Sequence, residues 1–235
     1  MALTTATTGA ALHPTEIDWA ALRQHYPESD GQPMADNTLQ FQWIDTITGG
    51  LQAFFRDAPD VFVAGDLLWY PVEGQPEICT APDTLVVFGR PKGHRGSYAQ
   101  FLEGGIAPQV TFEVLSPANT RQRMAEKRAF YERHGVEEYY EYDPDRGRLR
   151  GWLRHGATLD EIPQMQGWVS PRLGVRFFLE DGELGLYRPD GQRFQSYVEL
   201  EAGREQERQR AEQERQRADR LTARLRAAGI DPDTV

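Results

Sequence analysis

The sequence predicts an α/β protein of the α+β kind, in which helices flank a mixed β-sheet and a charged helical tail follows. Short segments rich in Val, Leu, Phe and Tyr, separated by Gly and Pro, are typical of strands. Two longer segments, residues 36–56 and 119–135, carry apolar residues at helical spacing. Residues 205–218 contain the heptapeptide EQERQRA twice in succession, which predicts a helix with a seven-residue period.

Length and composition are those of one sizeable globular domain or two small ones. The chain has 235 residues, of which 39% are hydrophobic, and a net charge of −10. This charge argues against a general nucleic-acid coat, although it leaves room for a local basic site. The single cysteine, Cys79, excludes a disulfide framework and a Cys-rich zinc site. The sequence shows neither an apolar stretch of about 20 residues nor a secretory signal, so we expect a cytoplasmic protein without a membrane partner.

The first 56 residues predict a lead-in followed by a helix. Residues 1–35 are rich in Thr, Ala, Pro, Asp and Gly, so we expect loose order with a short helix near residues 17–25. The main domain is expected over residues 36–198. It opens with a helix capped by Asp36 or Asn37, whose apolar face holds Leu39, Trp43, Ile44, Ile47 and Leu51.

Strands and one further helix are expected over the rest of this domain. The predicted strands are residues 61–70, 84–89, 109–115 and 136–143, followed by an antiparallel meander over residues 148–154, 175–179 and 184–187. The helix lies between the third and fourth strands. Asn119 or Thr120 can cap its N-terminus, and Gly135 can end it in a left-handed conformation.

The tail, residues 199–235, differs in kind from the domain. Ala211, Ala218 and Leu225 share one heptad position, but the seam is weak because Ala buries little surface and Glu214 falls where an apolar residue is wanted. Two interpretations remain open: a solvated single helix held by charged pairs three or four residues apart, or self-association that makes a homodimer. Dimerisation through the main domain is also open.

Charge is distributed unevenly along the chain. The tail carries −1, whereas residues 83–134 carry eight basic and five acidic residues, which gives +3. A positive segment on an acidic protein is expected where a phosphate group binds. Only two of the 26 basic residues are lysines, Lys92 and Lys127.

The pattern with chemical meaning is an Asp before one strand, a Glu inside the next, and a Lys on the following helix. Asp83 follows Pro82 directly before the apolar strand LVVF, and Glu113 lies within VTFEVL. A carboxylate in so apolar a strand is costly to bury unless it is paired or binds a metal. Two carboxylates on neighbouring strands can hold Mg²⁺, and a nearby Lys127 can orient or activate the attacking water.

At these residues the sequence resembles the bacterial Uma2 family of restriction-endonuclease-type proteins, within the PD-(D/E)XK nuclease superfamily. The resemblance covers about residues 36–190 and rests on APDTLVVFG, EGGIAPQVTFEVLSPANT and MAEKRAFYERHGVEEYYEYDP. It implies a restriction-endonuclease-like core, with Pro82–Asp83 as the PD element and Glu113 as the acidic residue. The sequence departs from the superfamily pattern at Leu115, where a Lys is usual, and Lys127 is the implied substitute.

Further residues are secondary candidates. Asp66 could be a third metal ligand, or simply a residue at the exit of its strand. Gln40 lies where the superfamily often carries an acidic or amide residue. Arg90, Lys92 and Arg95, in the loop FGRPKGHRGSY, could contact a phosphate backbone or could belong to a solvated loop.

Two functions compatible with this sequence belong to different classes. The first is an endonuclease that uses Mg²⁺ or Mn²⁺ to hydrolyse DNA, with Asp83, Glu113 and Lys127 as the catalytic residues. The second is a catalytically inactive nuclease-fold protein that acts in nucleic-acid binding or assembly, which the acidic body and the lack of a recognisable DNA-reading module favour.

Overall fold

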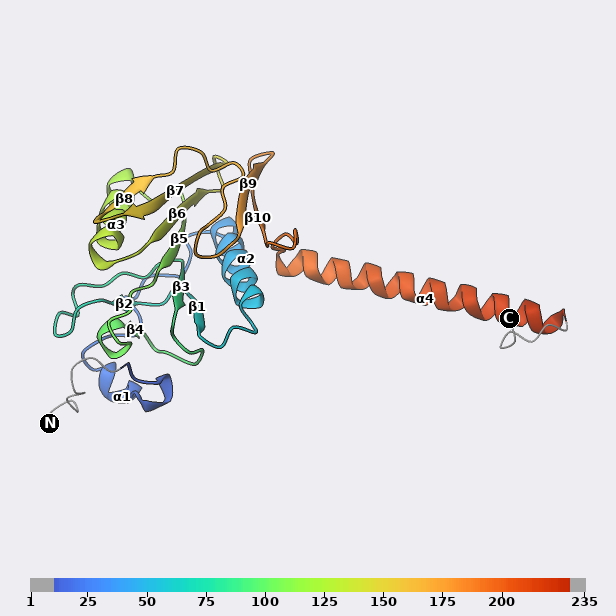
Figure 1. Cartoon of the computed structure of the whole chain (residues 1–235), viewed down its shortest axis with the longest axis horizontal. Coiled ribbons are helices and arrows are strands. Elements are labelled where there is room, and N and C mark those ends of the chain that lie inside the picture. Colours follow the sequence, from blue (N-terminus) through green and yellow to red (C-terminus); the bar gives the residue numbers. More distant parts are fainter. Residues whose placement is uncertain (1–10, 229–235) are drawn as a thin grey trace. The chain divides into compact units, whose positions relative to one another are not determined.

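A computed structural model of the chain describes residues 11–228 and falls into two units, divided between Phe194 and Gln195. The first unit is built on a six-stranded sheet in the order β1-β3-β5-β6-β7-β8 (Figure 1). β5 and β6 run parallel, and the other neighbouring strands are antiparallel. The predicted α/β class with a mixed sheet is therefore confirmed. The strands are β1 (Val61–Gly65), β3 (Thr84–Phe88), β5 (Val110–Val114), β6 (Glu138–Asp143), β7 (Arg148–His155) and β8 (Thr158–Glu161).

Two helices, α2 (Thr38–Phe54) and α3 (Arg121–His134), cover opposite faces of this sheet (Figure 1). Alternation along β5 places Phe112 in the core that α2 shares with the sheet. Glu113, the next residue, therefore points to the face that α3 covers. Tyr131 of α3 lies in the core of that second face.

The ends of both helices follow the capping signals of the sequence. The Asn37 side chain caps α2 by accepting a hydrogen bond from the Gln40 N–H, and Thr120 caps α3 in the same way. Gly135 ends α3 with φ 98°, a left-handed conformation that costs glycine little. The expected caps and ends of both helices are confirmed.

The expectation of one continuous strand over residues 61–70 is wrong. β1 stops at Gly65 because Asp66 has φ 47°, a left-handed conformation that breaks the extended chain. The chain resumes as β2 (Trp69–Tyr70), which pairs in parallel with β4 (Tyr98–Ala99) in a separate small sheet. This turn moves Asp66 out of the sheet ladder and to the end of β1.

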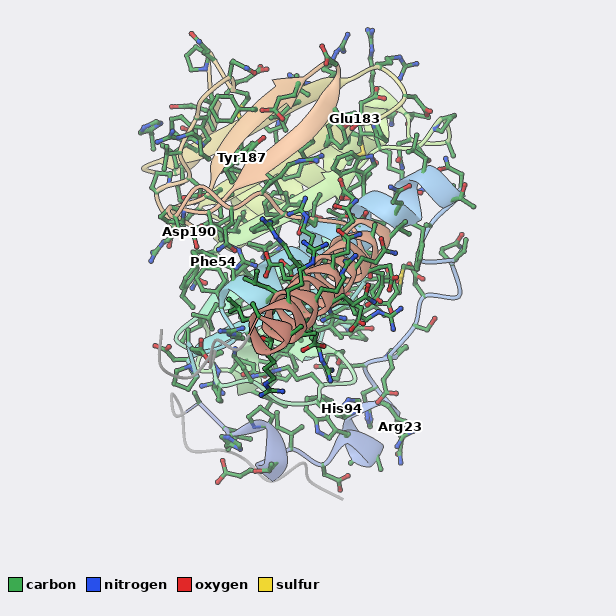
Figure 2. The ribbon with its side chains drawn as sticks, turned by 90° about the vertical axis from the view of Figure 1, so that its right-hand side faces the viewer. Arg23, Phe54, His94, Glu183, Tyr187 and Asp190 are labelled. Atoms are coloured by element: carbon green, nitrogen blue, oxygen red, sulfur yellow. The ribbon has the colours of Figure 1, made fainter. Side chains whose placement is uncertain are left out.

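The C-terminal strands do not form the single meander that the sequence predicts. β7 is followed by its partner β8, which the sequence pattern did not predict, whereas β9 (Arg176–Glu180) and β10 (Glu183–Tyr187) form a hairpin outside the main sheet. Figure 2 shows Phe54, at the end of α2, beside the loop of Asp190 that follows β10. In this contact the Arg188 guanidinium lies 5.7 Å from the centre of the Phe54 ring.

The N-terminal segment packs against the domain. It forms a 3₁₀ turn, η1 (Pro14–Glu16), and a short helix, α1 (Trp19–Leu22), near the expected position. Ile17, Leu22 and Tyr26 are buried in a cluster with Leu68 and Tyr70. Next to this cluster, a second 3₁₀ turn, η2 (Gln100–Leu102), follows β4.

The second unit is dominated by one long helix, α4 (Tyr197–Ala227). Ser196 and Glu199 form a reciprocal capping box at its start. Along its length, side-chain pairs three residues apart, such as Glu201–Arg204 and Glu205–Arg208, provide local support. Within residues 197–227 the helix has no buried side chain, and its self-association stays a prediction. No helix in residues 11–228 is long and apolar enough to cross a membrane.

Candidate active site

A cleft of about 380 Å³ brings together four residues that the sequence singled out. Asp66, Asp83, Glu113 and Lys127 all line it. They come from the turn after β1, the approach to β3, the middle of β5 and the middle of α3. Residues far apart in sequence therefore meet where three neighbouring strands lie under one helix.

Strand register explains why the three acids are neighbours. Thr84 pairs with Phe112, so continuing the ladder of β3 and β5 by one residue places Asp83 opposite Glu113. Asp66, directly after β1, donates its N–H to the Asp83 carbonyl at 3.3 Å. The parallel pairing of Glu113 with Glu141 extends this row to β6. The sheet therefore carries a line of carboxylates on the face that α3 covers.

Both oxygens of the Glu113 carboxylate are held by α3. Lys127 Nζ lies 2.7 Å from Oε2, and the Tyr131 hydroxyl donates a hydrogen bond to Oε1. Lys127 also donates to the carbonyl of Ala81, at 3.2 Å, just before β3. Glu113 is only 4% exposed, so the ammonium and the hydroxyl offset the cost of burying its charge.

Fewer polar contacts offset the cost of burying the Asp83 carboxylate. Its Oδ2 accepts a 2.6 Å hydrogen bond from the Val114 N–H, which ties the start of β3 to the end of β5. Burial and the neighbouring Glu113 charge raise the pKa of Asp83 well above its usual value, whereas Lys127 and the Val114 N–H act in the opposite direction. Asp83 therefore carries its negative charge at a cost to the fold.

Burial and the charges in the cleft also shift the pKa values of Lys127 and Asp66. Burial lowers the pKa of Lys127, but Glu113 and Asp83 more than offset this and leave it raised, so the amine is an ammonium at neutral pH. The pKa of Asp66 is also raised, mainly by burial and then by Asp30. Burial, followed by the Glu113 charge, raises the pKa of Tyr131 well above its usual value, so its hydroxyl remains a donor.

Gln40 links α2 to the end of the strand that carries Glu113. Its Nε2 donates to the Val114 carbonyl at 2.8 Å, and its Oε1 accepts from the Asp36 N–H at 2.8 Å. The Ser116 hydroxyl, just beyond β5, donates to the carboxylate of Asp36. Gln40 therefore lines the cleft as a structural link between its two walls, the N-terminus of α2 and the end of β5.

The donor set of the cleft suits a hard divalent cation. Three carboxylates, those of Asp66, Asp83 and Glu113, face the single ammonium of Lys127, and Mg²⁺ needs only one or two protein carboxylates besides water. Across residues 11–228, however, no three His, Cys, Asp or Glu side chains are grouped as a ready metal site. Asp66 therefore shares the cleft with Asp83 and Glu113 without joining them in a group of three, and a ligand pair of Asp83 and Glu113 stays a prediction.

The loop assigned to phosphate contacts lies elsewhere. Arg90 Nε donates to Glu103 at 2.6 Å and Arg95 Nε donates to the same carboxylate at 2.7 Å, and all three residues are buried. Lys92 donates to the carbonyls of Phe55 and Arg56 at the end of α2.

Figure 2 shows His94, from this loop, beside the N-terminal segment that carries Arg23. Arg90 and Arg95 therefore have a structural role. They neutralise the buried Glu103 carboxylate, and their guanidinium groups are not available to a phosphate backbone. The sequence could not reveal this, because nothing local identifies Glu103 as their shared partner.

Two cleft residues were missed as functional candidates. Tyr131 lies four residues after Lys127 on the same helical face, and that spacing is the signal that could have identified it. Arg123 lies one turn before Lys127 and lines the cleft with an exposed side chain. Within the described residues, its guanidinium has no carboxylate partner. It is thus the free cation of a cleft lined by six acids, Asp30, Asp36, Asp66, Asp83, Glu113 and Glu126.

Comparison with known proteins identifies the family of the chain. The Uma2 family model, described as "Putative restriction endonuclease", matches residues 26–225. Among solved structures, a crystal structure titled as a putative nuclease from Anabaena variabilis is similar, with 17% identity and a TM-score of 0.43 over 61% of this chain and 79% of that one. No curated protein matches the chain. Because the family model covers most of the sequence, the chain belongs to the Uma2 family of restriction-endonuclease-type proteins.

Proposed function

We propose that this protein is a divalent-cation-dependent endonuclease that hydrolyses phosphodiester bonds in DNA, with a PD-(D/E)XK type of site. The observation that carries the proposal is the buried Glu113 carboxylate. It is held by Lys127 and Tyr131 in one cleft with Asp83. The pKa values of Asp83 and Asp66 are raised, and acids with raised pKa values in one cleft are typical of catalytic sites. Family membership supports a nuclease role.

Asp83 and Glu113 would hold the cation, which we take to be Mg²⁺ or Mn²⁺. When bound, such an ion polarises a phosphoryl oxygen and lowers the pKa of a bound water. The protein contributes two carboxylates whose mutual repulsion, together with burial, raises the pKa of Asp83. This excess negative charge favours capture of a cation over an empty cleft.

For Lys127 we propose a narrower role than orienting or activating the attacking water. Because Glu113 and Asp83 keep its amine protonated, it is not a general base in this state. An ammonium next to the metal-binding carboxylate can position the attacking water by donating a hydrogen bond and can stabilise negative charge that develops on the phosphate. We therefore assign electrostatic stabilisation and positioning to Lys127.

Arg123 would contact the DNA backbone. It is exposed, lines the cleft one turn from Lys127, and lacks a carboxylate partner among the described residues. Arginine binds phosphate oxygens through two donors in a fixed geometry. A contact of this kind positions the strand without reading its sequence.

The test is cleavage of supercoiled plasmid with Mg²⁺, with Mn²⁺ and with EDTA. The wild type should cleave only with metal, and Asp83→Ala and Glu113→Ala should lose at least 100-fold in rate. Asp57→Ala, at an exposed acidic position away from the cleft, is the matched control and should cleave as the wild type does. Equal cleavage by all four proteins would indicate a contaminant and refute the assignment. Metal-dependent DNA binding without cleavage would support the inactive, DNA-binding alternative.

A further inference from the structure

Tyr131 contacts the proposed metal ligand directly. It lies in the last turn of α3, is fully buried, and its hydroxyl donates to Glu113 Oε1. Lys127, one turn earlier on the same helix, holds Oε2 at 2.7 Å. We propose that Tyr131 is a positioning residue that fixes the Glu113 carboxylate for metal binding. This inference rests on the proposed function and deepens it.

The Tyr131 ring is itself held firmly. It stacks on Trp69 with a centroid distance of 6.3 Å and packs against Tyr139 at 5.0 Å. The Thr80 side chain, which lines the cleft, also acts on the Tyr131 hydroxyl and lowers its pKa. A tyrosine has only two side-chain torsions, so packing on two sides leaves its hydroxyl almost no freedom.

The contacts from Lys127 and Tyr131 restrict the terminal side-chain torsion of Glu113. The terminal torsion of a glutamate is broad, so a carboxylate held at one oxygen can still turn. Glu113 is held at both, by groups from a single helix. A carboxylate oxygen has two lone pairs, so accepting from Tyr131 leaves Oε1 able to bind a cation.

The neighbouring tyrosine provides a matched control. Tyr139 is as deeply buried, packs in the same aromatic cluster, and its hydroxyl donates to Glu141 at 2.7 Å instead of to Glu113. Tyr131→Phe and Tyr139→Phe remove the same single atom from the same cluster. A purely structural role would give the two variants similar effects.

The experiment measures Mn²⁺ affinity of the full chain by calorimetry without DNA. Removing a hydrogen-bond partner of a metal ligand typically costs 10–100-fold in metal affinity. We expect Tyr131→Phe to weaken Mn²⁺ binding by that factor and Tyr139→Phe to leave it within about threefold. In the Glu113→Gln background, Tyr131→Phe should have no further effect, because the positioned ligand is gone.

This inference would be overturned if wild type and Tyr131→Phe bound Mn²⁺ with equal affinity, or if Tyr139→Phe lost as much affinity as Tyr131→Phe. Neither result would argue against the metal site itself. A wild-type protein that neither binds Mn²⁺ nor cleaves DNA would overturn the proposed function and this inference together. Should Tyr131→Phe fail to fold, Thr80→Val takes its place. It removes the side-chain hydroxyl that acts on the Tyr131 hydroxyl, and it should weaken Mn²⁺ binding by a smaller factor. Unchanged Mn²⁺ affinity in Thr80→Val would then count against the inference.

Discussion

Replacing Asp83 by Asn keeps the size of a buried side chain and removes its negative charge. Asp83 is 8% exposed, and burial together with Glu113 raises its pKa well above the usual value. Each unit of a raised pKa corresponds to about 1.4 kcal/mol of destabilisation once the group is ionised. The amide still accepts from the Val114 N–H, although losing a charged acceptor costs about 1 kcal/mol. We therefore expect Asp83→Asn to have a higher free energy of unfolding than the wild type in EDTA, because the cost of the buried charge outweighs the weaker hydrogen bond.

The sign of the pH dependence follows from the same raised pKa. The folded protein binds a proton on Asp83 more tightly than the unfolded chain does. The stability that this bound proton contributes is therefore fully present below the pKa that Asp83 has in the unfolded chain, about 4. It is lost as pH rises through the folded pKa. The advantage of Asp83→Asn over wild type should therefore grow as pH rises from 5 to 8.

Urea unfolding followed by tryptophan fluorescence measures this difference. Asp57→Asn removes the same charge from an 87% exposed side chain and should change stability by less than about 0.5 kcal/mol. Saturating Mg²⁺ should stabilise the wild type by about 2.7 kcal/mol at 100 times its Kd and the Asp83→Asn variant far less. The reasoning fails if Asp83→Asn is less stable than wild type in EDTA, or if its advantage does not change with pH.

Three further outcomes follow from the structure. Glu103→Gln removes the carboxylate that pairs with the buried Arg90 and Arg95, and it should lower the free energy of unfolding by about 3–5 kcal/mol. The cleavage rate per folded molecule should stay unchanged, whereas a selective loss of DNA binding would show that these arginines contact DNA. Arg123→Ala should weaken DNA binding and reduce the salt slope of log Kd by about 1, whereas Arg56→Ala, also exposed, should not; equal slopes would exclude the phosphate contact. A chain that ends at Ser196 should keep the melting temperature of the first unit within about 3 °C, as differential scanning calorimetry can check, because α4 buries no side chain within residues 197–227.

Local signals explain what the sequence could predict. Thr120 and Gly135 lie at the ends of α3 because capping depends on short-range hydrogen bonds and backbone preference. Glu113 stood out because an ionisable group inside an apolar strand is costly wherever that strand is buried. Asp83 and Glu113 then lie side by side because the pairing of two apolar strands aligns them.

Contacts between distant segments explain what the sequence missed. Arg90 and Arg95 looked like a solvated basic loop, and only the folded chain brings Glu103 between them. Asp66 ended a predicted strand through a left-handed turn that an apolar pattern does not encode. The Tyr131 hydroxyl likewise gains its importance from a sheet residue 18 positions earlier.

The location of Lys127 shows how this chain departs from the superfamily pattern that it resembles. Leu115, two residues after Glu113 and directly after β5, stands where the superfamily that the sequence resembles usually has a Lys. Lys127 instead reaches Glu113 from α3, at 2.7 Å, and Tyr131 reaches it from the next turn. One helix thus supplies both groups that hold the carboxylate. Any movement of α3 away from the sheet would release both contacts at once, so metal binding and the docking of α3 should be thermodynamically coupled.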